Sequence, residues 1–249
     1  MYACKVTTFG FDGLVVSGLM ALTGCVSMGS DGPAGQLGKG GTAGSGVAGS
    51  GEIPIVAATG ADVPYQFGAN PYGVAGGAFL ARASLGSSTV ALDTTQVGKI
   101  CLKGTVEMVP TPADGSHPPY STYWGIELGF NLNQGTDAVK SPWTVPVGVA
   151  GFWFTAEGPT IPPIRFKTTP TGRDPALEQD SCAQVNPASG DSTQVLFTNM
   201  YVQCWDGPLG TGTTNISGGL LDMGLQVAAA TGVEYPLDFC VTHVGVVTD

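Results

Sequence analysis

Three short stretches of the chain alternate apolar side chains with polar or aromatic ones, and the second set has the chemistry of a binding surface. These stretches are residues 124–134, 149–155 and 164–168. The polar positions include Asn131 in the first stretch, Trp153 in the second and Arg165 in the third. An indole ring offers an apolar π face, whereas amides and guanidinium groups offer directional hydrogen bonds. Together they suit a polar ligand with an apolar face, such as a sugar ring.

The candidate ligand-binding residues come from these stretches, from a later stretch at 220–227 and from two loops. Trp153 would stack on a sugar ring, and the loop tryptophans would overhang it. The alternative is that a loop or a second sheet covers Trp153, since large aromatic side chains are rarely left exposed. The predicted set is Trp153, Arg165, Asn131, Gln226, Glu127, Asp222, Trp143 and Trp205.

A catalytic interpretation rests on two of these residues, Glu127 and Asp222, because glycoside hydrolysis uses a pair of carboxylates. Acids on the wet face of a sheet are more often cross-strand partners of bases, here Arg165 and Lys167. The sequence has only two histidines and lacks the G-x-S-x-G and H-E-x-x-H motifs. We therefore predict a protein that is not an enzyme, with no catalytic residues.

Alternation with period two requires β-strands, which send neighbouring side chains to opposite faces. The 39 glycines and 18 prolines favour many turns between short strands. The composition is all-β, and eight to ten strands without a helix indicate a two-sheet sandwich, with jelly-roll topology. Expected strands are 78–81, 88–92, 100–109, 124–134, 149–155, 164–168, 194–198, 199–204, 220–227 and 237–247, with a polar loop at 169–191.

Four of the six cysteines fall in the predicted domain, at 53–249. In an exported chain an even number indicates two disulfides, with three connectivities possible. Pairing Cys101 with Cys240 would join an early strand to the last one, and pairing Cys182 with Cys204 would clip a long loop. A zinc site is disfavoured because no C-x-x-C pair occurs, so we expect no metal there.

The N-terminal region has the features of an export signal followed by a tether. Residues 1–25 contain one short apolar segment that ends in Leu-Thr-Gly-Cys, and Cys25 is the predicted lipidation site. Residues 26–52 are mostly Gly, Ser, Ala and Thr, a composition typical of a flexible linker. An ordinary signal peptide with an incidental cysteine is the alternative. It would make the protein secreted instead of lipid-anchored.

The balance of charge argues against two classes of partner. The chain has 9 Lys and Arg against 19 Asp and Glu, a formal net charge of −10. Nucleic acid and anionic membrane surfaces need basic side chains to neutralise phosphates. We therefore expect no nucleic-acid partner, and contact with a membrane only through the lipid anchor.

The order of elements resembles a known family. An aromatic strand, Gly151-Phe-Trp-Phe, is followed by Ile164-Arg-Phe166 and later by a terminal Phe239-Cys-Val. This order is similar to that of galactose-binding-domain-like jelly rolls, found as carbohydrate-binding modules and in bacterial surface lipoproteins. The resemblance covers about residues 75 to 247 and implies the jelly-roll fold. Members often hold a structural calcium, which Asp93 or Asp238 could help to bind here.

Together these patterns predict a monomeric, non-catalytic domain that binds a polysaccharide or glycan. Its place would be the bacterial cell envelope, in the outer membrane or on the cell surface. Two other functions stay open: a structural or adhesive surface lipoprotein that binds a protein partner, and a polysaccharide-active enzyme. We expect no cofactor, with a structural calcium ion as the alternative.

Overall fold

The structure is a computed structural model, and it describes most of the domain predicted from the sequence. The described residues are 50–57, 65–83, 89–93, 96, 98–114, 122–134, 139–172, 180–202, 204 and 215–249. The predicted signal peptide with Cys25, the tether up to residue 49, and Trp205 lie outside them. No helix in the described part is long and apolar enough to cross a membrane.

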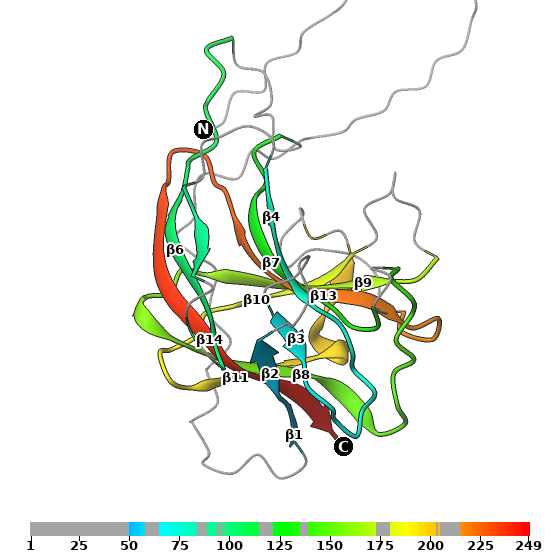
Figure 1. The fold of residues 1–249 in the computed structure, drawn as a ribbon. Helices are drawn as coiled ribbons and strands as arrows, with labels where there is room; N and C mark the ends of the chain where they lie inside the picture. Colours follow the sequence, from blue (N-terminus) through cyan, green and yellow to red (C-terminus); the bar gives the residue numbers. More distant parts are fainter. Residues whose placement is uncertain are drawn as a thin grey trace, which may run out of the picture. The chain divides into compact units, whose positions relative to one another are not determined.

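Two antiparallel sheets make up the domain, as the sequence predicted (Figure 1). The first sheet has the order β11-β8-β14-β6-β5, with β1 also paired to β14; the second has the order β12-β10-β9-β13-β7-β4. A small sheet pairs β2 with β3, and one 3-10 turn, η2, covers Phe197–Asn199. The jelly-roll β-sandwich expected from the sequence is confirmed. The strand bounds are β1 Ser50–Ile53, β2 Ile55–Ala57, β3 Tyr65–Phe67, β4 Ala78–Arg82, β5 Ala91–Asp93, β6 Ile100–Val106, β7 Gly125–Asn131, β8 Val149–Thr160, β9 Ile164–Pro170, β10 Ser181–Val185, β11 Ser192–Leu196, β12 Tyr201–Val202, β13 Leu220–Ala228 and β14 Tyr235–Thr248.

The core lies between the two sheets and is rich in phenylalanine. Phe152 and Phe154 of β8 in the first sheet are buried, and so is Phe166 of β9 in the second. The ring of Phe166 lies 6.0 Å from that of Phe152 and 6.2 Å from that of Phe154. These contacts join the inner faces of the two sheets, and burial of such large side chains supplies much of the stability.

Most of the predicted strands occur, but several of their bounds differ, and the larger differences are in β8, β10 and β1. β8 continues to Thr160, five residues beyond its predicted end. β10 lies inside the predicted polar loop; its residues Ser-Cys-Ala-Gln-Val have little strand propensity, and its ladder with β9 supplies the pairing. β1 begins at Ser50, inside the predicted tether, because Ile53 is buried in the core and extends a ladder along β14.

The predicted disulfide pairing is confirmed. Cys101 and Cys240 lie directly opposite each other in the β6–β14 ladder and are bonded. Cys182 of β10 is bonded to Cys204, 22 residues later. One bridge therefore ties strands within the first sheet, and the other fastens a chain segment to the second sheet.

Candidate functional site

Trp153 and Arg165 lie on different sheets, so the prediction that they share one surface is wrong. Trp153 is on β8, between Gln194 of β11 and Gly245 of β14. Arg165 is on β9 in the second sheet. Alternation fixes which side of a strand a residue occupies but not which strand lies beside it. Consecutive strands β8 and β9 belong to opposite layers and meet through their buried sides.

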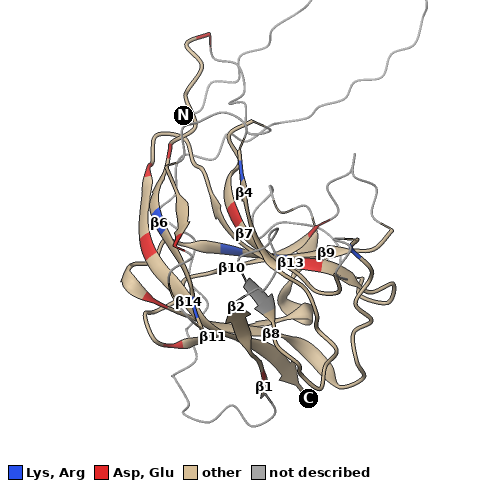
Figure 2. Ribbon diagram, viewed as in Figure 1, with Lys and Arg blue, Asp and Glu red and all other residues tan. Residues whose placement is uncertain are grey.

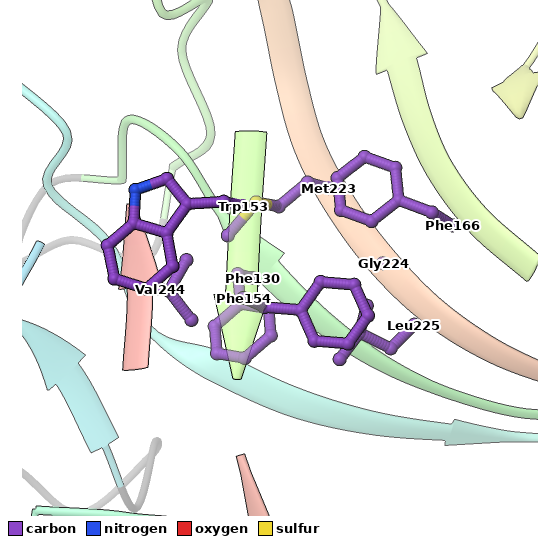
Figure 3. Close-up of a pocket in the computed structure, with 8 residues that line it drawn as sticks. All are labelled: Phe130, Trp153, Phe154, Phe166, Met223, Gly224, Leu225 and Val244. Atoms are coloured by element: carbon purple, nitrogen blue, oxygen red, sulfur yellow. The ribbon is translucent and has the colours of Figure 1, made fainter. Parts of the chain in front are cut away.

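Trp153 stands on the outer side of the first sheet. Its neighbours along the strand, Phe152 and Phe154, point into the core, and its indole turns away from the Phe154 ring (Figure 3). The ring packs over Gly245, where a Cβ would collide with the indole. Its Nε1 is buried and has no hydrogen-bond partner among the described residues. The ring is only half-buried and stands apart from the other candidate residues.

Trp143 is a core residue and does not overhang a ligand, so that prediction is also wrong. Its side chain is 3% exposed and lies 5.7 Å from the Phe152 ring. Its Nε1 donates a hydrogen bond of 2.9 Å to the backbone carbonyl of Tyr72. The loop that carries Trp143 forms a bridge to Leu220, which draws the ring into the space between the sheets.

The other five candidates, Arg165, Gln226, Asp222, Glu127 and Asn131, come together on the outer side of the second sheet. We call this surface the polar face. Its residues follow three rows across the strands, according to the register of the ladders. The rows are Gln184, Arg165, Gln226 and Glu127; then Tyr201, Cys182, Lys167, Gly224, Gly129 and Phe79; then Thr169, Asp222 and Asn131.

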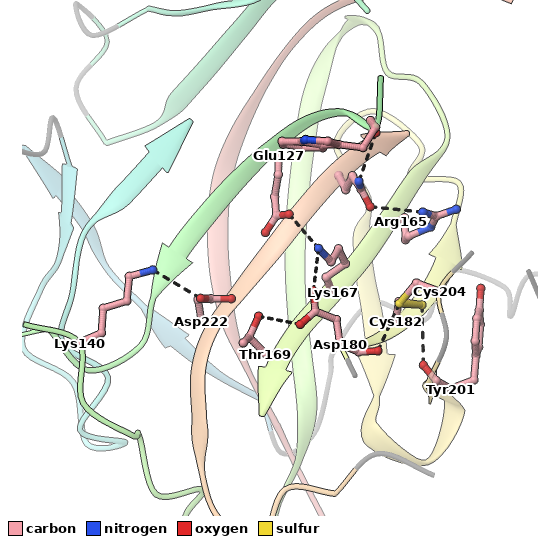
Figure 4. Close-up of polar contacts among 12 residues, drawn as sticks. Glu127, Lys140, Arg165, Lys167, Thr169, Asp180, Cys182, Tyr201, Cys204 and Asp222 are labelled. Carbon is pink, nitrogen blue, oxygen red and sulfur yellow. Dashed lines mark hydrogen bonds and ion pairs between the residues drawn. A yellow bond between two sulfur atoms is a disulfide. The ribbon is translucent and has the colours of Figure 1, made fainter. Parts of the chain in front are cut away.

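Lys167 is the centre of a charged network on the polar face (Figure 4). Its Nζ lies 3.1 Å from Glu127 Oε2 and 3.0 Å from Asp180 Oδ2. Thr169 Oγ1 donates to the other Asp180 oxygen, at 3.3 Å. The three charged side chains are only 12–15% exposed, so water screens their attraction less than it would at an open surface.

The network changes the proton affinities of its members in ways that follow from burial and charge. Burial raises the pKa of Glu127, and the charge and hydrogen bond of Lys167 oppose that rise. Burial acts to lower the pKa of Lys167, but Glu127 and Asp180 outweigh it, and the net pKa is raised. Lys167 therefore stays protonated at neutral pH, as the shared partner of two acids.

Arg165 and Gln226 form a buried support beneath one end of the face. Arg165 Nη1 donates to Gln226 Oε1 at 3.4 Å, and Gln226 Nε2 donates to the carbonyl of Trp124 at 3.3 Å. Their exposed fractions are 9% and 1%. Burial lowers the pKa of Arg165 and raises that of Tyr201, the aromatic neighbour on β12.

Asn131 is similarly buried, at 3% exposure, and its Nδ2 donates to Gln134 Oε1 at 2.6 Å. Asn131, Arg165 and Gln226 therefore lie on the predicted face but are turned toward protein partners. The side chains with exposed surface there belong to other residues. They include Glu127, Lys167, Asp180, Asp222, Tyr201 and Phe79.

Phe79 and Tyr201 were missed from the sequence. Phe79 of β4 lies over Gly129, where a Cβ would collide with the ring. Tyr201 lies at the opposite edge, on the two-residue strand β12. In the sequence Phe79 is one of several apolar residues in a row, so no alternation reveals its face. The signal that could have found it is the glycine of the neighbouring strand.

Both signs of charge occur on the second sheet, and also on β6 and β14 of the first sheet (Figure 2). Lys140 Nζ lies 3.6 Å from Asp222 Oδ2 and 4.8 Å from the centre of the Phe79 ring. No group of three or more His, Cys, Asp or Glu side chains in the described part could hold a metal. Of the two acids considered for calcium, Asp93 accepts from Gln96, and Asp238 pairs with Lys103 at 2.9 Å.

Comparison with known proteins gives matches among solved structures only: no family model matches the sequence, and no curated protein matches it. One similar structure is the family 11 carbohydrate-binding module of the cellulosomal cellulase Lic26A-Cel5E of Clostridium thermocellum. Its TM-score is 0.44 at 12% sequence identity, and the match covers 80% of this chain and 95% of that one.

A second similar structure is the family 11 module from Clostridium thermocellum in complex with a β-1,3-1,4-mixed-linked tetrasaccharide, with TM-score 0.43. A third is the solution structure of CtCBM11, with TM-score 0.42. Both are 12% identical, and the matches cover 81% of this chain and 97% and 98% of those chains. What this chain binds has to follow from its own residues.

Proposed function

We propose that the polar face binds a carbohydrate without transforming it. The observation that carries this proposal is the pattern of the middle row, with an aromatic ring at each end and Lys167 between them, flanked by Glu127 and Asp222 of the rows on either side. Phe79 lies on edge strand β4 and Tyr201 on edge strand β12. A row across six strands is about 24 Å long at about 4.8 Å per strand. That length suits an oligosaccharide better than a single sugar.

The ligand contacts divide between aromatic and charged side chains. Phe79 and Tyr201 offer ring surface to the C–H faces of sugars, and Glu127, Lys167 and Asp222 offer acceptors and donors to hydroxyls. Glu127 and Lys167 are already held by an ion pair, so little of their side-chain entropy is lost on binding.

The buried residues of the face act as its support. Arg165 and Gln226 fix one end of the first row, and Asn131 fixes the end of the third through Gln134. Their role is to hold the exposed groups in place, because all three side chains are buried and each donates a hydrogen bond to another part of the protein. This differs from the direct hydroxyl contacts that the sequence suggested.

Binding without catalysis fits the state of the two suspected carboxylates. Glu127 and Asp222 each have a lysine partner, Lys167 at 3.1 Å and Lys140 at 3.6 Å. The raised pKa of Glu127 is the observation that favours an enzyme, since a general acid needs a raised pKa. The lysine beside it works against that role because it stabilises the ionised form.

Display on a bacterial envelope through Cys25 completes the proposal. It rests on the apolar segment and the Leu-Thr-Gly-Cys sequence that ends it. β1 begins at Ser50, so 24 residues would separate the lipidated cysteine from the first strand. Intact mass of the exported protein would show the added acyl chains.

A glycan array tests the proposed function. We expect the wild-type protein to bind at least one polysaccharide class, and Phe79→Ala and Tyr201→Ala to weaken that binding about fivefold or more each, because stacking on a ring contributes about 1 kcal/mol or more. Incubation with the bound polysaccharide should release no shorter products. Wild-type binding that survives both substitutions unchanged would contradict the proposal.

A further inference from the structure

One corner of the polar face holds a positive charge between an aromatic ring and a carboxylate. Lys140 Nζ lies 4.8 Å from the Phe79 ring centre and 3.6 Å from Asp222 Oδ2. Attraction to the ring's π electrons and to the acid act together on this ammonium group. The corner is therefore built to hold a cation, and here the protein's own lysine occupies it.

The backbone prepares the ring for this contact. Phe79 lies over Gly129 of β7, and any larger residue there would push the ring out of position. With one ring face on the sheet, the cation has to approach the other face. Asp222, on the neighbouring strand β13, is only 13% exposed, so its charge is partly shielded from water.

Lys140 is held loosely enough to be displaced. Its side chain is 42% exposed, and its contact with Asp222 is longer than the 2.9 Å contact between Lys103 and Asp238 on the first sheet. Ion pairs with an exposed partner contribute little to stability. A ligand that brings its own ammonium group could take the place of the lysine at small cost.

We propose that this corner recognises the free amino group of a de-N-acetylated amino sugar. The inference rests on the proposed function and names its ligand class: a glycan that carries protonated amines, such as an oligomer of glucosamine. An ammonium in place of Lys140 would restore both contacts, with Phe79 and with Asp222. An N-acetylated or a neutral sugar at the same position would restore neither.

The acidic side chains near this corner of the polar face favour a cationic ligand. The polar face carries the acids Glu127, Asp180 and Asp222, and when Lys140 swings away, the bases among the named residues are Lys167 and Arg165. The face is then acidic by one charge, three acids against two bases, and the whole chain has a net charge of −10. Both would draw a cationic polysaccharide and repel an anionic one.

The test compares length-matched β-1,4-linked tetramers of glucosamine, N-acetylglucosamine and glucose, by calorimetry on the full-length protein. We expect the glucosamine tetramer to bind about tenfold more tightly than the other two. Asp222→Asn should reduce this ratio to about threefold or less. Lys140→Met should raise affinity for the glucosamine tetramer about threefold, because the competing ammonium is gone.

Lys103→Met is the matched control, since it removes a lysine from an ion pair on the first sheet. It should leave all three affinities unchanged. Equal binding of the glucosamine and N-acetylglucosamine tetramers would overturn the inference while the proposed function stands. A preference for glucosamine that persists in Asp222→Asn would overturn the corner as its cause. No binding of any array glycan would contradict the proposed function itself.

Discussion

At the scale of residues, Trp153 distinguishes a glycan site on the first sheet from one on the polar face of the second sheet. The sequence places this ring among polar side chains, but in the fold it stands on the outer side of the first sheet, away from Arg165. Trp153→Ala should therefore leave glycan affinity within about twofold of wild type while Tyr201→Ala weakens it. The array or calorimetry would measure both. A loss of binding in Trp153→Ala alone would move the site to the first sheet.

Glu127 gives a prediction about pH. Its native pKa is raised above its ordinary value of 4.5, so the folded protein keeps this proton to a higher pH than the unfolded chain does. The free energy of unfolding contributed by Glu127 is then present below about pH 4 and is lost as pH rises through the native pKa. Glu127→Gln removes this titration.

Urea unfolding at pH 4, 5, 6 and 7 would check this. The free energy of unfolding of Glu127→Gln minus that of wild type should become more positive as pH rises over this range. Glu157→Gln, at an exposed position on β8, controls for the loss of a carboxylate. A difference that stays constant, or that falls with pH, would contradict the raised pKa.

At the scale of elements, glycines determine how the strands of the second sheet carry their side chains. A Cβ at Gly129 would meet the Phe79 ring, and one at Gly224 would meet the Glu127 carboxylate. Gly129→Ala should therefore displace the ring, lower stability by about 1 to 3 kcal/mol and weaken glycan binding. Thermal unfolding and calorimetry would measure the two effects.

Gly190→Ala is a control for the loss of stability alone. Gly190 has a φ of 84° in a turn beside the first sheet, so a side chain there strains the backbone without touching the polar face. Both variants should be less stable, but only Gly129→Ala should bind glycan more weakly. Equal glycan affinities in the two variants would mean that binding does not depend on the position of the Phe79 ring over Gly129.

The two disulfides should differ in what they stabilise. In the chain-entropy account, the Cys101–Cys240 bridge, with a separation of 139 residues, contributes about 5 kcal/mol, and the Cys182–Cys204 bridge, with 22, about 3 kcal/mol. Replacing the first pair by serines should cost more stability in urea unfolding. Replacing the second should cost more glycan affinity, because Asp180 and Tyr201 flank it. The reverse order of affinities would contradict this placement.

The elements also show how far the sequence alone could go. Alternation identified β7, β8 and β9 and the side of each strand that is buried, because one face of each packs on the core. Alternation could not show that the neighbour of β9 is β13 and not β8. Strand pairing depends on contacts between residues far apart in the chain. Glu127, Asp222 and Arg165 were correctly placed on one face. Trp153 lies on the other sheet, and Trp143 packs in the core instead of overhanging the face.

At the scale of the whole molecule, the two outer sides of the sandwich have different chemistry. The second sheet carries a charged network between two aromatic edges, whereas the first carries the separate Trp153 ring and the Cys101–Cys240 bridge. Burial of the phenylalanines between the sheets keeps both surfaces rigid. A rigid, preorganised face is what weak sugar contacts need in order to add up to binding.

The most direct measurement is an NMR titration of the isotope-labelled protein with the oligosaccharide that binds most tightly on the array. Amide shifts report where the ligand sits, whichever side chains are involved. The account predicts that the shifted amides cluster on β4, β7, β9, β13 and around Tyr201. Shifts that cluster instead on β8 and β11, around Trp153, would contradict it.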